Sequence, residues 1–498
     1  MKTSILVALI ASTIAVAWRW NSYVAGGSDS YCYVEQAQRW AAALTFSAPL
    51  QPVESLALEA PWPNAPATFT PVRHAPSQIR PGAIVPVCPS GLSLAMAPFV
   101  VAGGPRAAFL VLPLFAAVLV LATYVAGSRF GAAIGVASAA LTAASPIVLY
   151  QAVQPMSDLP AAAMWMTAVA YATGTKRRHF VIAGLAASAA ILIRPNLVPL
   201  GFAIGAFLAL RPERTWPQRF QEAVTYAACC VPGCLAVALI QWTFFGSPLA
   251  SGYGAFDSLF ASANMTPNLE RYLSWLWQSH TPFIALAVVA PLVLPGALTG
   301  LFVSMFAVNL ALYLPCLVFE DWSFLRFLLP TIPLLLILTI AVVDSLLRRF
   351  VAPAPLQGRR RVAVLTVIVA GLSWIFVAEA RDGTFVGERL PADAIVLTAW
   401  ETGSVRFYGQ RTSIDWTALD PAWLDRALDD LRSRGYEPFL LFERSEEAGF
   451  REHFAAASPL GALDWPPAYE VATQVRIYRP GDRRLFLEGS VAPTEFVR

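Results

Sequence analysis

The chain has 498 residues, of which 57% are hydrophobic and only 13% are charged. Soluble chains carry about 25% charged residues, so this composition excludes an ordinary soluble enzyme and indicates a membrane protein. The formal net charge of +3 is too small to indicate a nucleic-acid partner, and we expect none. The six cysteines form no CxxC motif and the four histidines are scattered, so a dedicated zinc site is not expected.

Apolar segments recur through residues 1–379, whereas residues 382–498 have the composition of soluble sequence. A membrane-spanning helix needs about 20 mostly apolar residues, and on this basis we predict an all-α polytopic bundle with about eleven transmembrane helices. The expected spans are 4–18, 107–127, 131–150, 160–174, 180–194, 196–210, 221–242, 282–296, 298–318, 327–346 and 362–379.

The basic residues between these spans predict the orientation. If Lys2 is cytoplasmic, the clusters Lys176–Arg178 and Arg359–Arg361 fall on the same side, as the positive-inside rule requires. The long loop 19–105 and the C-terminal residues then lie outside the cytoplasm. Met1–Ala17 also has the pattern of a cleavable signal peptide. We expect it to stay as a helix, because the chain continues at once into a loop that carries candidate site residues.

Residues 1–379 are expected to form the membrane domain, including the first outer loop 19–105. Within that loop, Ser28–Leu44 has apolar residues at helical spacing and is predicted to be an amphipathic helix at the interface. Residues 50–89 are rich in proline and are expected to be irregular. Leu92–Val101 is apolar but too short to span, so it is expected to be interfacial or re-entrant.

Residues 382–498 alternate strand-like and helix-like runs and are predicted to form a periplasmic α/β domain. The expected strands are Ala394–Thr398, Phe439–Phe442 and Val471–Tyr478. Pro421–Arg434 is predicted to be a helix, because Asp420 before it is a good N-cap residue.

Two aspartates stand at the outer ends of predicted spans. Asp29 follows Gly26 and Gly27, which allow a tight turn where the chain leaves the membrane. Asp158 precedes the span that begins at Pro160. Each aspartate could simply cap a helix. Alternatively, two carboxylates at one membrane face could share acid–base work or hold a divalent cation.

Several cationic side chains are expected on the same side. Arg194 lies inside an apolar stretch, where a charge is costly and usually faces a partner or polar cavity. Arg326 could instead extend its side chain to lipid headgroups. Guanidinium groups bind phosphate through paired hydrogen bonds, so either arginine could bind a lipid phosphate. Arg73, His74 and Arg80 add positive charge to the first loop, where the two arginines could equally be solvated.

The order of the motifs is similar to that of a known family. Gly-Gly-Ser-Asp29-Ser-Tyr is followed by Cys88-Pro-Ser-Gly-Leu-Ser-Leu, Gln-Pro-Met-Ser-Asp158-Leu-Pro, Ile-Arg194-Pro-Asn and Arg326-Phe-Leu-Leu-Pro. Phe-Gly-Ser-Pro-Leu-Ala-Ser-Gly-Tyr-Gly, residues 245–254, stands between the last two. This set resembles the bacterial GT-C glycosyltransferases, relatives of protein O-mannosyltransferases and aminoarabinose transferases, and especially the Rgt-type lipopolysaccharide galacturonosyltransferases. The likeness covers roughly residues 1–350.

The resemblance implies a membrane glycosyltransferase that takes a sugar from a polyprenyl-phosphate donor. Asp29 would be the catalytic base that activates a hydroxyl of a glycan, lipid or protein acceptor, with inversion at the sugar carbon. Asp158 would help to bind or orient substrate or a cation, and Arg194 and Arg326 would bind the donor and stabilise the charge that develops on its leaving phosphate. Apart from the resemblance, we expect His74 to bind substrate and any metal to be held by Asp29 and Asp158. The implied location is a bacterial inner membrane, in contact with its lipids. The chain departs from the family pattern after Cys88, where many relatives have a second proline, and this concerns acceptor choice.

The alternative is a transporter or a flippase for lipid-linked sugars. Transporters usually contain inverted repeats and bind substrate at the middle of the membrane. This sequence has no evident repeat, and its polar candidates gather at one face, which favours chemistry at the surface. Cys32 and Cys88 share the outer loop, where an oxidising compartment would allow them to pair or leave two separate buried thiols.

Overall fold

The computed structural model describes residues 2–21, 23, 25–44, 51–52, 55–77, 79–254, 256–319, 321–350, 389–407, 409–471, 475–490 and 493–497. The chain divides into two compact units. The first comprises Met1–Tyr23, Pro89–Ile240 and Tyr253–Ala378, and the second comprises Val24–Cys88, Gln241–Gly252 and Glu379–Arg498.

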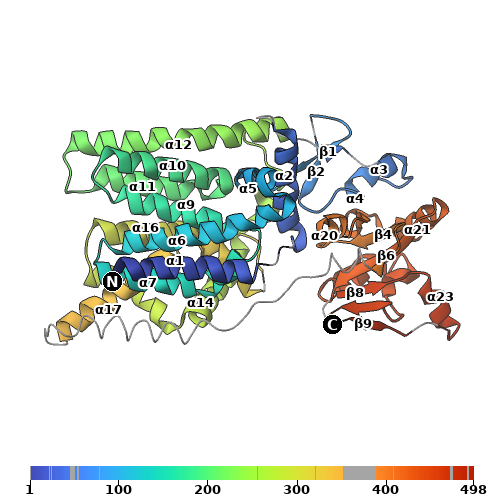
Figure 1. Ribbon diagram of the computed structural model, residues 1–498. Helices are drawn as coiled ribbons and strands as arrows, with labels where there is room; N and C mark the ends of the chain where they lie inside the picture. Colours follow the sequence, from blue (N-terminus) through green and yellow to red (C-terminus); the bar gives the residue numbers. More distant parts are fainter. Residues whose placement is uncertain are drawn as a thin grey trace. The chain divides into compact units, whose positions relative to one another are not determined.

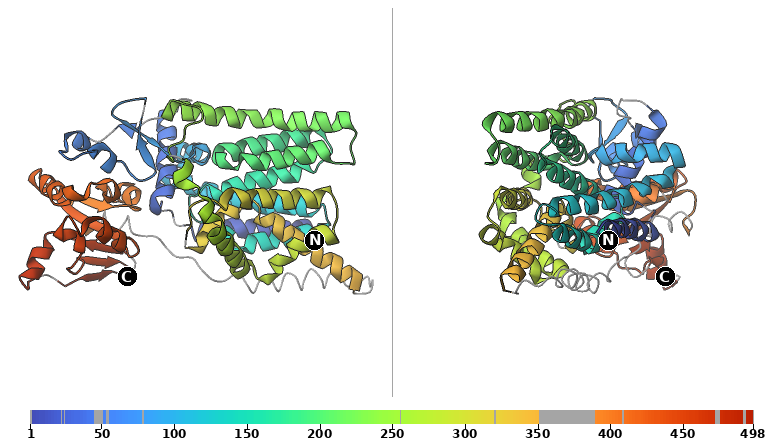
Figure 2. Two further views of the ribbon diagram at one scale, coloured as in Figure 1. Left: turned by 180° about the vertical axis from the view of Figure 1, so that it is seen from behind. Right: turned by 60° about the vertical axis from the view of Figure 1, so that its left-hand side comes forward.

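The first unit is a helical bundle whose long helices lie side by side (Figures 1 and 2). Helix α9 packs against both α6 and α10, and α6 also packs against α1 and α7. Small residues such as Ala116, Ala161 and Ala187 are fully buried, which lets the helix backbones approach closely. The main helices are α1 (Lys2–Arg19), α5 (Gly91–Gly103), α6 (Val111–Gly127), α7 (Ala132–Ala144), α8 (Pro146–Ala152), α9 (Asp158–Ala172), α10 (Arg177–Ile193), α11 (Val198–Leu210), α12 (Trp216–Phe245, whose last residues belong to the second unit), α14 (Met265–His280), α15 (Ala290–Val293), α16 (Ala297–Tyr313) and α17 (Ile332–Phe350).

Short 3-10 helices join several of these elements. They are η1 (Pro105–Leu110), η2 (Pro195–Leu197), η3 (Ser262–Asn264), η4 (Pro282–Val289) and η5 (Trp322–Leu328), and a further short helix is α13 (Phe256–Leu259). Proline occupies the first position of η1, η2 and η4, where its missing N–H costs nothing.

Within the described part of the chain, two helices are long and apolar enough to cross a membrane, Pro105–Gly127 and Trp216–Phe245. Three bent pairs raise the number to five if each pair is one span, with bends of 59°, 114° and 82°. The other predicted spans coincide with helices, but several are interrupted by proline or are shorter than a full span. The predicted span 362–379 lies outside the described residues.

In the second unit, the first loop is more ordered than its proline content suggested. Helix α2 (Gly27–Ala43) confirms the predicted helix. Residues 50–89, predicted to be irregular, include a three-stranded sheet in the order β1-β3-β2. Its strands and neighbouring helices are β1 (Gln51–Pro52), α3 (Ser55–Glu59), α4 (Ala65–Thr68), β2 (His74–Pro76) and β3 (Ala83–Pro86). A disulfide joins Cys32 of α2 to Cys88, so of the two alternatives that the sequence left open the pairing is the one found.

The rest of this unit is built on a six-stranded sheet in the order β5-β4-β6-β8-β7-β9. Strands β5, β4 and β6 are parallel, and β8 pairs antiparallel with both β6 and β7. The strands are β4 (Ala394–Thr398), β5 (Thr412–Asp415), β6 (Glu437–Glu443), β7 (Tyr469–Val471), β8 (Val475–Tyr478) and β9 (Glu495–Val497). The first two predicted strands are thus confirmed, whereas the predicted strand Val471–Tyr478 covers all of β8 and only the last residue of β7.

Helices cover this sheet. The predicted helix after Asp420 is confirmed, since the Asp420 side chain accepts a hydrogen bond from the backbone N–H of Ala422. The helices are α20 (Thr402–Phe407), η6 (Trp416–Ala418), η7 (Pro421–Trp423), α21 (Leu424–Ser433), α22 (Glu446–Phe454), η8 (Pro459–Ala462) and α23 (Asp482–Leu487).

The first loop and the C-terminal residues share one hydrophobic core. Trp62 and Phe69 are buried in the same cluster as Leu397, Phe442 and other residues of the six-stranded sheet. The backbone N–H of Val72 donates to Oγ1 of Thr402 over 3.0 Å. The compact unit therefore extends beyond the predicted C-terminal domain of 382–498, because apolar side chains of the loop complete its core.

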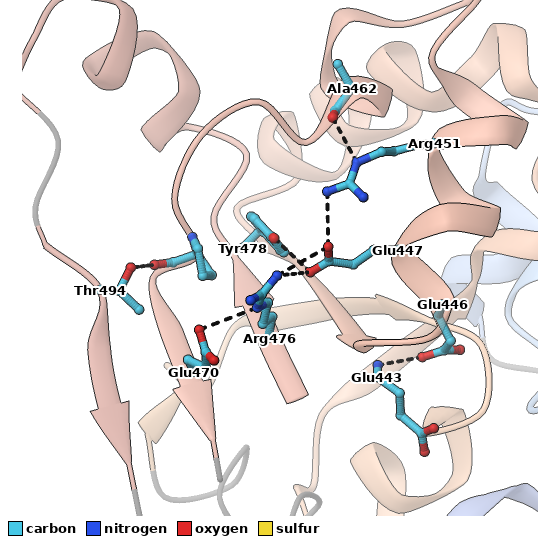
Figure 3. Close-up of polar contacts among 10 residues, drawn as sticks. Glu443, Glu446, Glu447, Arg451, Ala462, Glu470, Arg476, Tyr478 and Thr494 are labelled. Atoms are coloured by element: carbon cyan, nitrogen blue, oxygen red, sulfur yellow. Dashed lines mark hydrogen bonds and ion pairs between the residues drawn. The ribbon is translucent and has the colours of Figure 1, made fainter. Parts of the chain in front are cut away.

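Glu447 is the common acceptor of several polar side chains in this domain (Figure 3). Its carboxylate accepts hydrogen bonds from Arg451 (3.0 Å), Arg476 (3.2 Å) and the hydroxyl of Tyr478 (2.8 Å). The neighbouring Glu446 accepts hydrogen bonds from the backbone N–H groups of Glu443 and Trp400. Burial, with a smaller effect of nearby carboxylates, raises the pKa of Glu446 to about 7.

Candidate functional site

In the first unit, a buried polar cluster forms around Asp158. This residue opens helix α9, after Ser157 as the N-cap residue, and its side chain is almost fully buried. Nη1 of Arg194 donates to its Oδ1, and Nε of Arg326 lies 3.9 Å from its Oδ2. Asp158 is therefore not the cap of this helix, and its carboxylate faces two guanidinium groups.

The end of α10 positions Arg194. Pro195 disfavours helical backbone in the residue before it, and Arg194 has φ −148° and ψ 84°. Its Nε donates to the hydroxyl oxygen of Tyr313 over 3.0 Å, and Nδ2 of Asn196 donates to the same oxygen over 2.7 Å. A Cβ on Gly91 would overlap the backbone just before Arg194, so α5 can approach this site only with glycine there.

Arg326 is held by aromatic rings. Its guanidinium carbon lies 4.6 Å from the ring centroid of Phe324 and 5.5 Å from that of Phe327, distances typical of cation–π contacts. The side chain is 13% exposed. The alternative that Arg326 extends to lipid headgroups therefore does not describe this structure.

The cluster combines two guanidinium groups with one carboxylate, so its formal charge is +1 among largely buried side chains. A buried cationic site of this kind can bind an anion with strong, charge-assisted hydrogen bonds. It can also stabilise negative charge that develops on a leaving group.

In the second unit, Asp29 lies in the first turn of α2. Gly26 is the N-cap residue and Gly27 has φ +73°, so the helix begins before Asp29 and does not use it as the cap. Oδ1 of Asp29 lies 2.6 Å from Nε of Arg73, and both side chains are partly exposed. Arg73 has φ +68°, an uncommon conformation for a residue other than glycine. Arg73, for which a solvated side chain was one alternative, thus forms an ion pair. Arg80 is exposed.

His74, also predicted as a substrate-binding residue, follows Arg73 in the chain and is buried. Its side chain is 1% exposed, and its Nε2 lies 3.7 Å from Oε2 of Glu35. Glu35 also pairs with Arg39. Burial alone would raise the pKa of Glu35, but the nearby side chains of His74 and Arg39 lower it overall. In this arrangement His74 supports the residues around Arg73 from the interior.

The predicted metal position can be tested within each unit. Among the described residues, no group of three or more His, Cys, Asp or Glu side chains could hold a metal ion. Asp29 is paired with Arg73 and Asp158 with Arg194, and a guanidinium is not a metal ligand. Within its own unit each carboxylate therefore has a guanidinium as its partner, and a cation held jointly by Asp29 and Asp158 stays a prediction.

Two members of the Asp158 cluster escaped the sequence analysis. Tyr313 lies in an apolar span, where an aromatic residue has the same pattern as ordinary core. Asn196 stands in the motif with Arg194, and its polar side chain beside a short span was a usable signal. Arg194 and Asn196 both donate to the hydroxyl oxygen of Tyr313, which lies on α16, far away in sequence, and no local pattern reports that contact.

The fold is similar to those of known membrane enzymes. No model of a known protein family matches the chain, and no curated protein matches its sequence. ArnT from Cupriavidus metallidurans bound to undecaprenyl phosphate has a similar structure, with a TM-score of 0.57 and 11% identity over 91% of this chain and 95% of that one. The apo state of the same protein gives a TM-score of 0.55 with 12% identity over 99% of both chains.

The oligosaccharyltransferase of Archaeoglobus fulgidus in its apo form is also similar, with a TM-score of 0.53 and 12% identity. That likeness covers 95% of this chain and 74% of the archaeal one. At such low identity these comparisons show the fold alone. They confirm the GT-C fold that the order of the sequence motifs implied.

Proposed function

We propose that this chain is a membrane glycosyltransferase that moves a sugar from a polyprenyl-phosphate donor to a hydroxyl acceptor on the periplasmic face. The observation that carries the proposal is the buried cluster in which Arg194 and Arg326 both face Asp158. It provides a cationic site for a phosphate within a fold that is shared with a protein solved with undecaprenyl phosphate.

The donor phosphate is assigned to Arg194 and Arg326. Each guanidinium has aromatic rings packed against it, which hold the group in place. Asp158 would orient the two arginines and keep the site from holding an excess of positive charge. When the glycosidic bond to phosphate breaks, both cations stabilise the added negative charge on the lipid phosphate.

Asp29 is assigned as the general base. Its carboxylate would accept the proton of the acceptor hydroxyl while the hydroxyl oxygen forms a bond to the anomeric carbon. The bond from that carbon to the phosphate oxygen breaks at the same time, and its electron pair leaves with the phosphate. Such a direct displacement inverts the anomeric centre. Arg73 would orient the Asp29 carboxylate, since its Nε contacts one carboxylate oxygen.

The assignment to the periplasmic face of a bacterial inner membrane rests on the distribution of basic residues. A disulfide between Cys32 and Cys88 is consistent with an oxidising compartment. The acceptor belongs to the classes found at that face, a glycan, a lipid or a protein.

The test is transfer by the purified full-length protein, measured as release of undecaprenyl phosphate from undecaprenyl-phosphate sugars in the presence of envelope extract. We expect Arg194→Met to reduce binding of undecaprenyl phosphate and transfer together. Arg80→Met is the matched control, because Arg80 is an exposed arginine of the first loop. Movement of lipid-linked sugar across proteoliposomes without any transfer would favour a flippase and refute the proposal.

A further inference from the structure

Helix α8 (Pro146–Ala152) lies beside the Asp158 cluster. It is a short helix of 7 residues that is bent by 59° from α7. It contacts η5, which carries Arg326, and α9, which begins at Asp158. The ring of Tyr150 lies 5.5 Å from that of Trp322 at the start of η5. A side chain of α8 can therefore take part in the same site.

Gln151 on this helix has an unusual environment. It is completely buried, and neither its Oε1 nor its Nε2 has a hydrogen-bond partner within the described part of the chain. Buried polar groups are nearly always hydrogen-bonded, and an unsatisfied carboxamide lowers stability. By contrast, the buried amide of Asn268 in the same unit donates to the carbonyl oxygens of Leu314 (3.0 Å) and Cys316 (2.7 Å).

The chemistry of the amide restricts its missing partner. Oε1 needs a donor and Nε2 needs an acceptor, so the missing partner must supply both. An ionised phosphate or carboxylate only accepts, and so it cannot satisfy Oε1. A sugar hydroxyl both donates and accepts. The position next to the proposed phosphate site favours the sugar that is attached to that phosphate.

We infer that Gln151 is a binding residue for the sugar of the lipid-linked donor, which it recognises through a hydroxyl group. This inference rests on the proposed function and extends it, because it separates recognition of the sugar from recognition of the phosphate. Arg194 and Arg326 would determine affinity for the lipid phosphate. Gln151 would determine how much affinity the sugar adds.

The test uses Gln151→Met in the full-length protein, since methionine has nearly the same volume without hydrogen-bonding groups. Binding is measured for undecaprenyl phosphate alone and for undecaprenyl phosphate that carries glucose, mannose, galactose or galacturonate. For the sugar that adds most affinity in the wild type, we expect the variant to lose about tenfold. Its affinity for undecaprenyl phosphate alone should stay within about twofold of the wild type.

Thermal unfolding without ligand is the second measurement, and it shows whether Gln151 has only a structural role. Without ligand, Gln151→Met should unfold at the same or a higher temperature than the wild type, because it removes a buried polar group that lacks a partner. Gln154→Met is the matched control, since Gln154 is a half-buried glutamine on the same segment, and it should change neither measurement.

Three outcomes would overturn the inference while leaving the proposed function intact. They are equal loss for both lipids, no loss for either, and a lower unfolding temperature in Gln151→Met. A further outcome would also overturn the inference: if no attached sugar increases the affinity of the wild type for the lipid, the partner of the Gln151 amide is water. Failure of the wild type to bind undecaprenyl phosphate at all would refute the inference and the proposed function together.

Discussion

Replacement of Asp158 by asparagine should destabilise the first unit strongly. The change keeps the shape of the side chain but removes the carboxylate that faces Arg194 and Arg326. The formal charge of these three side chains rises from +1 to +2. The Asp158 side chain is 2% exposed and the two arginines 14% and 13%, so water screens the remaining charges poorly. Removing one partner of a buried ion pair costs about 3–5 kcal/mol.

Arg194→Met should cost less, about 1–3 kcal/mol, because Asp158 keeps Arg326 as a partner and Tyr313 keeps its hydrogen bond from Asn196. In the double variant, Asp158→Asn with Arg194→Met, the charge of the cluster returns to +1. The two costs should therefore not add, and we expect a coupling of about 1–3 kcal/mol between the two positions.

The assay is chemical unfolding of the four purified proteins in one detergent, read by a probe of the first unit such as tryptophan fluorescence. In parallel, Asp158→Asn should bind undecaprenyl phosphate at least as tightly as the wild type, because no carboxylate competes for the arginines. The reasoning is refuted if Asp158→Asn unfolds like the wild type or if the costs of the two substitutions simply add.

Three further predictions concern the second unit. Asp29→Asn should reduce transfer at least about a hundredfold at unchanged donor affinity and stability, and retention of most of the rate would remove Asp29 as the base. Replacing Cys32 and Cys88 by serine should lower the free energy of unfolding by about 2–5 kcal/mol, whereas wild-type stability after reduction would show that the disulfide contributes little. Because the pKa of Glu446 is raised to about 7, its contribution to stability is present below its ordinary pKa and lost as the pH rises through 7. The temperature of the unfolding midpoint should fall as the pH is raised from about 5 to about 8 in the wild type, and Glu446→Gln should make this temperature depend less on pH. The same pH dependence in the variant would contradict the assignment.

The sequence predicted those features that depend on local pattern. Helix α2 and strands β4 and β6 follow from the spacing of apolar residues, and the helix after Asp420 follows from a capping side chain. The aspartates and arginines of the candidate site were identified because charge in or beside an apolar segment is costly and needs a reason.

The partners of these residues could not be predicted in the same way. Arg326 and Asp158 are far apart in sequence, and only the packing of η5 against α9 brings them together. Trp62 and Phe69 have no apolar periodicity around them, because their core partners belong to the C-terminal strands. The short strands of the first loop were missed for a similar reason, since two to four residues are too few to show alternation.

The C-terminal residues also influence the proposed base. Helix α20 packs against α2, and Gly403 lies so close to the ring of Tyr31 that an added Cβ would overlap it. Tyr31 follows Asp29 by two residues, and so a displaced ring would shift the first turn of α2. We expect Gly403→Ala to lower kcat of transfer about tenfold or more without changing the KM for the donor, because small misplacements of a base are costly.

Gly449→Ala is the matched control, since a Cβ there would meet only Trp416 of the same domain at an ordinary 3.7 Å. It should leave kcat unchanged. Equal kcat in both variants would show that the position of Asp29 does not depend on α20. A selective loss in Gly403→Ala would instead assign the C-terminal residues a direct part in positioning the base, as their shared core with the first loop leads us to expect.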